Sequence, residues 1–368
     1  MLIGVTLASR GFSDAAVGAL LAALLAGAAA VSVLIARYGD WVGRRRCYRL
    51  LFVVMAAAGS VFAFSGSLPA LIVAALTGAI STDVVESGPF TSLEQAMLPH
   101  TGGDATRLFG TYNTVATLAG SVGALLALVG SSPRWLLAYP LAAAVALLAA
   151  ARLSPAVERG DELDADPLPP LHRSRGIVRR LSALFALDSF GGGFVPQTFI
   201  AYLFVRKYGA SPQTLAIVFF AIGLLQALSF QGAVRLARRI GLLRTMVYTH
   251  LPSNLLLAAV AFAPTLTSAI ALLLARFLLA QADVPTRQAY VMAVVDPSER
   301  TAAAAYTNTA RYITRPIAPL LAGAVIRGAL GAPFVIAGAL KSIYDVGLYA
   351  LFRSVDVASE RRAAVVPR

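Results

Sequence analysis

Charged side chains stand inside long apolar stretches of this chain, and each of them needs a physical reason to be there. In a bilayer, a charge at the centre of a helix costs about 2.5–3.5 kcal/mol on insertion scales. Asp283 and Arg287 are four residues apart, so on one helix they can form an ion pair that lowers this cost. Pro285 between them opens the helix and frees a backbone carbonyl. This pattern fits a substrate-binding or gate element and, equally, a purely structural pair.

Asp188 is the second candidate, because no cation lies within one helical turn of it and three glycines follow at residues 191–193. Glycines let another helix or a ligand approach closely. The carboxylate is therefore a candidate carrier of a proton or a cation, with a salt bridge between helices as the alternative. Asp83 and Glu86 are three residues apart in another apolar stretch, and two such carboxylates repel unless one of them holds a proton. We expect these two residues to be a further proton site.

Two more pairs have helical spacing. Arg311 and Arg315 repel each other on one helix, so they need anions from Asp283, from Asp188 or from an anionic substrate. We expect these two arginines at a cytoplasmic gate. Lys341 and Asp345 have the spacing of an intrahelical ion pair, and we expect that pair to be structural. Asn113 could offer a hydrogen bond to a bound solute.

No set of residues points to an enzyme or to a metal site. The chain has a single cysteine, Cys47, and its three histidines are far apart in sequence, so no disulfide and no metal-ligand spacing is present. It has no phosphate loop of the G-x-x-x-x-G-K type and no nucleophile–base arrangement. The sequence predicts no catalytic residue, no metal and no cofactor.

Apolar helices must position these side chains. Of the 368 residues, 58% are hydrophobic and 13% charged, whereas about 25% of the residues of a soluble protein are charged. The net charge of +13 does not indicate nucleic acid, because the charges lie in loops between apolar spans. We predict an all-α integral membrane protein with eleven full transmembrane helices and a short N-terminal stub at residues 1–8. The predicted spans are 15–36, 50–68, 70–98, 108–129, 135–151, 181–204, 215–234, 242–262, 268–295, 302–326 and 333–352.

A polar, proline-rich and charged stretch divides these spans. The predicted organisation is an N-terminal transmembrane half at 1–152, a linker at 153–180, a C-terminal transmembrane half at 181–353 and a tail at 354–368. Of the 31 lysines and arginines, twenty-one lie on the linker side of the predicted membrane and five on the other side. The positive-inside rule therefore places the linker and the C-terminus in the cytoplasm.

The two halves repeat at an offset of about 200 residues. The pattern R-x5-G-x2-R at 37–46 recurs at 235–244, and Asp-Val at 83–84 recurs at 283–284. Two homologous halves are the arrangement of transporters whose substrate site lies between the halves near the middle of the membrane.

The loop between the first two long spans, residues 36–45, has the sequence A-R-Y-G-D-W-V-G-R-R. It resembles the loop signature G-x-x-x-D-R-x-G-R-R/K of the major facilitator superfamily. Asp40, Gly43, Arg44 and Arg45 match, whereas positions 36 and 41 depart from the signature. The resemblance covers the whole chain except most of the first helix, whose absence we attribute to a mis-assigned start or a fragment.

The resemblance implies two six-helix halves in a pseudo-two-fold arrangement that move a small molecule or ion by alternating access. We expect proton-coupled efflux of a small organic compound or toxic ion, as in bacterial efflux-type members, with proton-coupled uptake as the alternative. A membrane sensor or scaffold that transports nothing is the alternative of another class. The protein would be a monomer within the lipid bilayer of a plasma membrane, the bacterial inner membrane. The predicted cytoplasmic gate consists of Asp40, Gly43, Arg44, Arg45, Glu94, Arg311 and Arg315.

Overall fold

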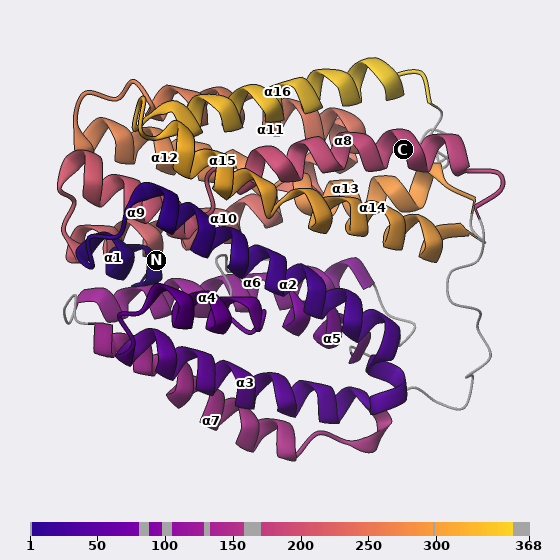
Figure 1. Ribbon diagram of the computed structural model, residues 1–368. Helices are drawn as coiled ribbons and strands as arrows, with labels where there is room; N and C mark the ends of the chain where they lie inside the picture. Colours follow the sequence, from indigo (N-terminus) through magenta and orange to yellow (C-terminus); the bar gives the residue numbers. More distant parts are fainter. Residues whose placement is uncertain are drawn as a thin grey trace.

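The computed structural model describes residues 2–80, 88–97, 105–128, 133–157, 171–296 and 299–355. Within these ranges the chain forms helices joined by turns, which confirms the predicted all-α class. Figure 1 shows two stacked groups of roughly parallel helices, with the N-terminal group below and the C-terminal group above. The count of eleven spans and a stub, and the domain boundaries, stay predictions.

The N-terminal group contains α1 (Leu2–Ser9), α2 (Asp14–Val42), α3 (Arg44–Phe64), α4 (Leu68–Leu76), α5 (Pro89–Met97), α6 (Ala105–Ala124) and α7 (Ala138–Ala151). The C-terminal group contains α8 (Arg175–Gly193), α9 (Gln197–Tyr208), α10 (Pro212–Ile240), α11 (Leu242–Val260), α12 (Leu266–Ala280), α13 (Asp283–Val294), α14 (Arg300–Thr314), α15 (Ile317–Val325) and α16 (Ala332–Phe352). Short 3₁₀ turns occupy Leu125–Leu128, Pro133–Leu137 and Pro155–Val157.

Long apolar helices with apolar outer surfaces make up the bundle. Large side chains point outward on several of them: Phe64, Leu141, Leu148 and Phe262 are 69–76% exposed. Such a surface is a liability in water, but it is what a lipid-facing helix requires. Six stretches of the described chain are long and apolar enough to cross a membrane: Asp14–Ile35, Arg44–Phe64, Arg134–Ala151, Pro212–Ile240, Leu266–Val294 and Ala332–Phe352.

Two glycines make matching corners in the two groups. α2 ends and α3 begins at Gly43 (φ 97°), and α10 ends and α11 begins at Gly241 (φ 87°). Glycine adopts such φ values without the steric cost that a Cβ would bring. The N–H of each glycine donates to the carbonyl four residues earlier, on Gly39 and Ala237. The repeat in the sequence is thus a repeat in backbone geometry. We call the edge of the bundle at Gly43 the Gly43 end and the opposite edge, where α2 begins at Asp14, the Asp14 end.

Four of the predicted spans are interrupted, and the opening expected around Pro285 is one of these interruptions. Pro196 and Pro316 stand at two of the interruptions, because proline lacks an N–H and disfavours helix in the residue before it. Gly78 (φ 69°) lies after the end of α4 at a third. Pro285 falls in the first turn of α13, where proline is tolerated, so that helix breaks just before it. The interrupted spans are 70–98 after α4, 181–204 between α8 and α9, 268–295 between α12 and α13, and 302–326 between α14 and α15.

The two groups touch closely at the Asp14 end. α2 and α15 cross at Gly18 and Gly323, where a Cβ on Gly323 would lie 2.6 Å from the Asp14 carbonyl oxygen and 3.2 Å from the Gly18 Cα. The Asp14 carboxylate accepts a hydrogen bond from the Tyr202 hydroxyl, and its Oδ1 lies 3.3 Å from a guanidinium nitrogen of Arg206. Small residues and one ion pair therefore hold the two groups together at this end.

Candidate functional site

A cavity of about 150 Å³ lies inside the C-terminal group, where its helices are broken. Residues 195–197, 280, 281, 283, 284 and 315, at three of the interruptions, form part of its wall. Non-helical backbone inside a membrane protein is tolerated where it is buried or lines a cavity, and discontinuous helices line transporter sites. The ionisable lining residues of the described chain are Asp188, His250, Arg276, Asp283, Arg287, Arg311, Arg315 and Lys341.

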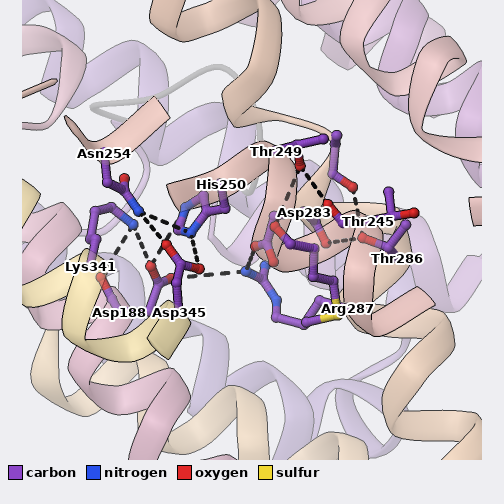
Figure 2. A network of polar contacts seen from close by, with 12 residues as sticks. Asp188, Thr245, Thr249, His250, Asn254, Asp283, Thr286, Arg287, Lys341 and Asp345 are labelled. Atoms are coloured by element: carbon purple, nitrogen blue, oxygen red, sulfur yellow. Dashed lines mark hydrogen bonds and ion pairs between the residues drawn. The ribbon is translucent and has the colours of Figure 1, made fainter. Parts of the chain in front are cut away.

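Asp188 on α8 forms an ion pair with Lys341 on α16 (Figure 2). Both side chains are buried, with 4% and 7% of their surface exposed. Gly191 permits this approach, because a Cβ there would lie 3.0 Å from the Lys341 Cγ. The predicted pair of Lys341 with Asp345 is therefore wrong, and the salt bridge between helices that was the alternative for Asp188 is present. Spacing places two groups on one face of a helix, but packing decides which neighbour is nearer.

Asp345 instead binds two side chains of α11 that sequence reasoning missed (Figure 2). The His250 Nδ1 lies 2.9 Å from Asp345 Oδ1, and the Asn254 amide donates to Asp345 Oδ2 over 2.8 Å. All three residues are buried, and Asp345 and Asn254 are 0% exposed. The available signal was a histidine and an asparagine one turn apart in an apolar span.

Asp283 and Arg287, at the start of α13, form the predicted intrahelical ion pair. Both are buried, at 2% and 5% exposure. The guanidinium of Arg287 also lies 3.9 Å from Asp188 Oδ2, so this pair joins the network around Lys341 (Figure 2). The interruption before Asp283 brings the pair to the cavity wall.

Arg311 and Arg315 line the cavity together with Arg276, a buried arginine of α12. The structure thus brings the two predicted gate arginines to the same space as Asp188. Each of the three makes further interactions within the protein. Their part in a gate stays a prediction.

The other predicted residues do not reach the described cavity wall. Glu94 accepts hydrogen bonds from the hydroxyls of Tyr48 and Tyr112. Asn113 on α6 is half-buried. Gly43 makes the corner described above, and Arg44 and Arg45 begin α3 after it. Asp83, Glu86 and the side chain of Asp40 lie outside what the structure describes.

The chemistry that this arrangement permits is the exchange of ion pairs. Guanidinium and ammonium groups bind carboxylates. A carboxylate that loses its cationic partner can take up a proton instead, and so can a neutral imidazole. Among the described residues, no group of three His, Cys, Asp or Glu side chains could hold a metal ion. The cavity also has apolar wall residues, including Val195, Phe277 and Val284.

Comparison with known proteins identifies the family. The family model described as Major Facilitator Superfamily matches residues 1–319. The uncharacterised membrane protein YJR124C of Saccharomyces cerevisiae is 25% identical over 394 residues, which cover 94% of this chain and 88% of the yeast protein.

Solved structures share the fold. The nucleoside transporter NupG, in a mutant form, superposes with a TM-score of 0.73 at 15% identity over 95% of this chain and 96% of its own. A D-xylose–proton symporter has a TM-score of 0.72 at 14% identity, over 95% and 92%. The human organic anion transporter MFSD10 has a TM-score of 0.58 at 19% identity, over 94% and 83%.

Proposed function

We propose, because this chain belongs to the major facilitator superfamily, that its buried polar network couples the movement of a small solute to protons. The chain is a multi-pass membrane transporter of the secondary type and not an enzyme. Its two groups of helices would rock about the cavity and expose it to one side of the membrane at a time. The contacts at the Asp14 end, at Gly18, Gly323 and Arg206, would break in one of the two states.

The observation that carries the proposal is that one buried carboxylate, Asp188, faces three basic groups on other helices. Lys341 forms an ion pair with it, and Arg287 and His250 each lie 3.9 Å from one of its oxygens. A charge in such a place is costly, so it must be kept neutral by partners or by a proton. A proton that enters this network changes which pairs form, and this links proton uptake to the shape of the cavity.

The proposal extends to the class of solute and to the direction of its transport. The solved relatives are named for a nucleoside, for D-xylose with a proton, and for organic anions, so the shared fold does not choose among chemical classes. We propose a small organic compound, since the described cavity measures about 150 Å³. We keep efflux, the direction that the resemblance to efflux-type members implies, and uptake driven by protons is the alternative.

We also propose that the Gly43 end faces the cytoplasm, because the arginine-rich loop and the linker belong to that side. A plasma membrane stays the proposed location. The relative in Saccharomyces cerevisiae makes the membranes of a eukaryotic cell equally suitable for such a protein.

The test is transport by purified protein in liposomes with an imposed pH gradient. A small-molecule extract of yeast serves as the probe, and mass spectrometry of the vesicle contents identifies any solute that accumulates. A solute that enters the vesicles under one polarity of the pH gradient and leaves them under the other supports a proton-coupled transporter. The polarity that drives entry gives the direction of coupling. The absence of gradient-dependent accumulation with either polarity contradicts proton coupling.

Asp188→Asn is expected to abolish gradient-dependent accumulation while the protein still expresses and folds, because the amide cannot hold the charge that the network exchanges. The matched control is Asp296→Asn, which changes an aspartate whose partner, Arg173, has an 83% exposed side chain. This control should transport as the wild type does. Unchanged accumulation in Asp188→Asn would remove Asp188 from the mechanism.

A further inference from the structure

Two basic groups on different helices compete for a single oxygen atom. The Lys341 ammonium binds Asp188 Oδ1, and the Nε2 of His250 lies 3.9 Å from the same oxygen. Lys341 comes from α16 and His250 from α11. Figure 2 shows both side chains meeting Asp188 from neighbouring helices. Only one of them needs to hold the carboxylate at a time.

The hydrogen bonds of His250 decide which of its two ring nitrogens can accept a proton. Its Nδ1 lies 2.9 Å from Asp345 Oδ1, and an ionised carboxylate only accepts, so Nδ1 carries the hydrogen. The Asn254 Nδ2 lies 3.1 Å from Nδ1 and 2.8 Å from Asp345 Oδ2, and we assign its hydrogen to the carboxylate as the stronger acceptor. In the neutral ring, Nε2 then carries a lone pair and no hydrogen, so it faces Asp188 without donating a hydrogen bond.

We propose that His250 is the group that takes the transported proton, and that its protonation frees Lys341 to bind an anionic group of the substrate. A proton that enters through the cavity adds to Nε2, no covalent bond between heavy atoms changes, and the ring gains one positive charge. The new N–H points toward Asp188 Oδ1 and replaces Lys341 as its partner. This inference rests on the proposed function and adds to it the proton-binding residue and the class of substrate.

Charged groups of both signs, from several helices, surround His250. Asp345 on α16 and Asp188 on α8 flank the ring with two carboxylates. Lys341 of α16 and Arg287 of α13 are the cations that share Asp188, and Asp283 holds Arg287. Tyr344 of α16 packs its ring edge-on against the imidazole, at 5.8 Å between centroids. His250 lines the cavity, so a proton has a route to it.

The freed ammonium determines the chemistry of the ligand. Lys341 lies in the cavity wall together with apolar lining residues that include Val195, Phe277 and Val284. A cavity of about 150 Å³ is the size that holds a benzene molecule in an engineered protein core. A carboxylate on a body of that size, such as benzoate, can pair with Lys341 while its ring contacts the apolar wall.

Proton and anion would then bind together: the proton on His250 releases Lys341 from Asp188, and the anion pairs with the released Lys341. Co-binding moves both in the same direction across the membrane. Under an inward proton gradient this favours the uptake alternative over efflux.

The experiment follows the ring nitrogens of the histidines by NMR in detergent micelles. The chain has only three histidines, so a ¹⁵N-histidine-labelled His100→Gln/His172→Gln variant shows only the two ring nitrogens of His250 without altering the site. We expect His250 to show a protonated Nδ1 and a bare Nε2 at high pH, and to gain the Nε2 proton as the pH falls. A ring with the opposite tautomer, or one that never takes up the proton while the protein stays folded, overturns the proposal.

Three probes of similar size then test the substrate class: benzoate, benzamide and benzylamine. Benzoate should move the midpoint of the ring titration to higher pH by about 0.7 unit or more, which is the roughly fivefold coupling at the low end of allosteric linkage. Neutral benzamide and cationic benzylamine should not. Lys341→Met should abolish the effect of benzoate. The control is Lys207→Met, which changes the only other lysine of the chain, at the Asp14 end.

The outcomes separate this inference from the function on which it rests. An equal response to benzoate and benzamide, or a benzoate response that survives Lys341→Met, overturns the release of Lys341 to an anion. Accumulation of a neutral solute in the liposome assay would then leave proton-coupled transport standing without this inference. If liposomes accumulate nothing with either gradient, the proposed function itself fails, whatever the histidine does.

Discussion

Two buried carboxylates of this protein are stabilised by different kinds of partner. Asp188 relies on cations from other helices, whereas Glu299, before α14, relies on backbone donors. The N–H groups of His172, Arg173 and Ser174 donate to its two oxygens over 2.6, 2.9 and 2.8 Å. These donors lead into the N-terminus of α8, which favours negative charge. Glu299 therefore fastens the end of the linker to the C-terminal group.

The hydrogen bonds to Glu299 have a consequence for pH. Above all the one from the His172 N–H, they lower the pKa of Glu299 to about 2. A carboxyl group whose pKa is lowered by folding contributes stability above its unfolded pKa and loses it as the pH falls through the folded value. The docking of the linker is thus expected to persist through the neutral and mildly acidic range and to fail only as the pH approaches about 2.

Glu299→Gln is expected to release the linker end. The carboxylate has two acceptor oxygens, whereas the amide keeps one of them and replaces the other with an NH₂ group, which cannot accept a hydrogen bond from a backbone N–H. Cleavage by trypsin after Arg173 should become several-fold faster at neutral pH, as measured by the loss of full-length protein. Asp296→Asn is the control: it removes the ion pair with Arg173, whose side chain is 83% exposed, and such pairs contribute little. Equal cleavage rates in the two variants would show that Glu299 does not hold the linker.

At the scale of elements, the interruptions and the glycine crossings have different tasks. The breaks beside Pro196, Pro316 and Asp283 bring polar backbone and charged side chains to the cavity. The crossing of α2 with α15 at Gly18 and Gly323 instead closes the Asp14 end, where no Cβ fits between the two helices. The interruptions build the site, and the crossing brings the two groups of helices into close contact.

Gly323→Ala is expected to weaken closure at the Asp14 end, because its Cβ would meet the Asp14 carbonyl oxygen at 2.6 Å. Overpacking of this kind costs about 1–3 kcal/mol, which shifts the balance toward the state open at that end. Pulsed EPR between spin labels at Ser67→Cys and Ser211→Cys, in a Cys47→Ser background, should show longer distances.

The control for this variant is Gly123→Ala on α6, where a Cβ would meet nothing within 4 Å. It should leave the distance distribution unchanged. A Gly323→Ala distribution that matches the control would mean that the crossing of α2 and α15 does not set the closed state.

At the scale of the whole molecule, the two halves share a backbone plan but not their chemistry. The corners at Gly43 and Gly241 match, and each joins a 29-residue helix to the next. Among the described residues, however, the charged cavity wall belongs to the C-terminal group alone. We therefore regard the C-terminal group as the half that binds, and the N-terminal group as the half that moves against it.

Orientation belongs to this scale, and the single cysteine reports on it. Cys47 is half-buried at the Gly43 end, next to the arginine-rich loop. A maleimide that does not cross membranes is expected to label Cys47 in inside-out vesicles but not in intact cells. Ser67→Cys in a Cys47→Ser background, on an exposed residue at the Asp14 end, should label with the opposite preference. Labelling of Cys47 from outside intact cells would invert the proposed topology.

The sequence alone determined the properties that depend on neighbours in the chain. Apolar length predicts helices that cross a membrane, and the loop at 36–45 indicates the family. The corner at Gly43 and its repeat follow from one residue type. The pair of Asp283 with Arg287 is also local, because four residues on a helix are always neighbours.

The tertiary structure alone decided the pairs that form between helices. Lys341 could reach Asp345 on its own helix, yet it binds Asp188, which is 153 residues away. His250 and Asp345 meet across 95 residues. Such contacts depend on how helices pack and on where they break, and no spacing rule contains this information. For that reason the charged residues of the site were predictable one by one, whereas their partners and the cavity between them were not.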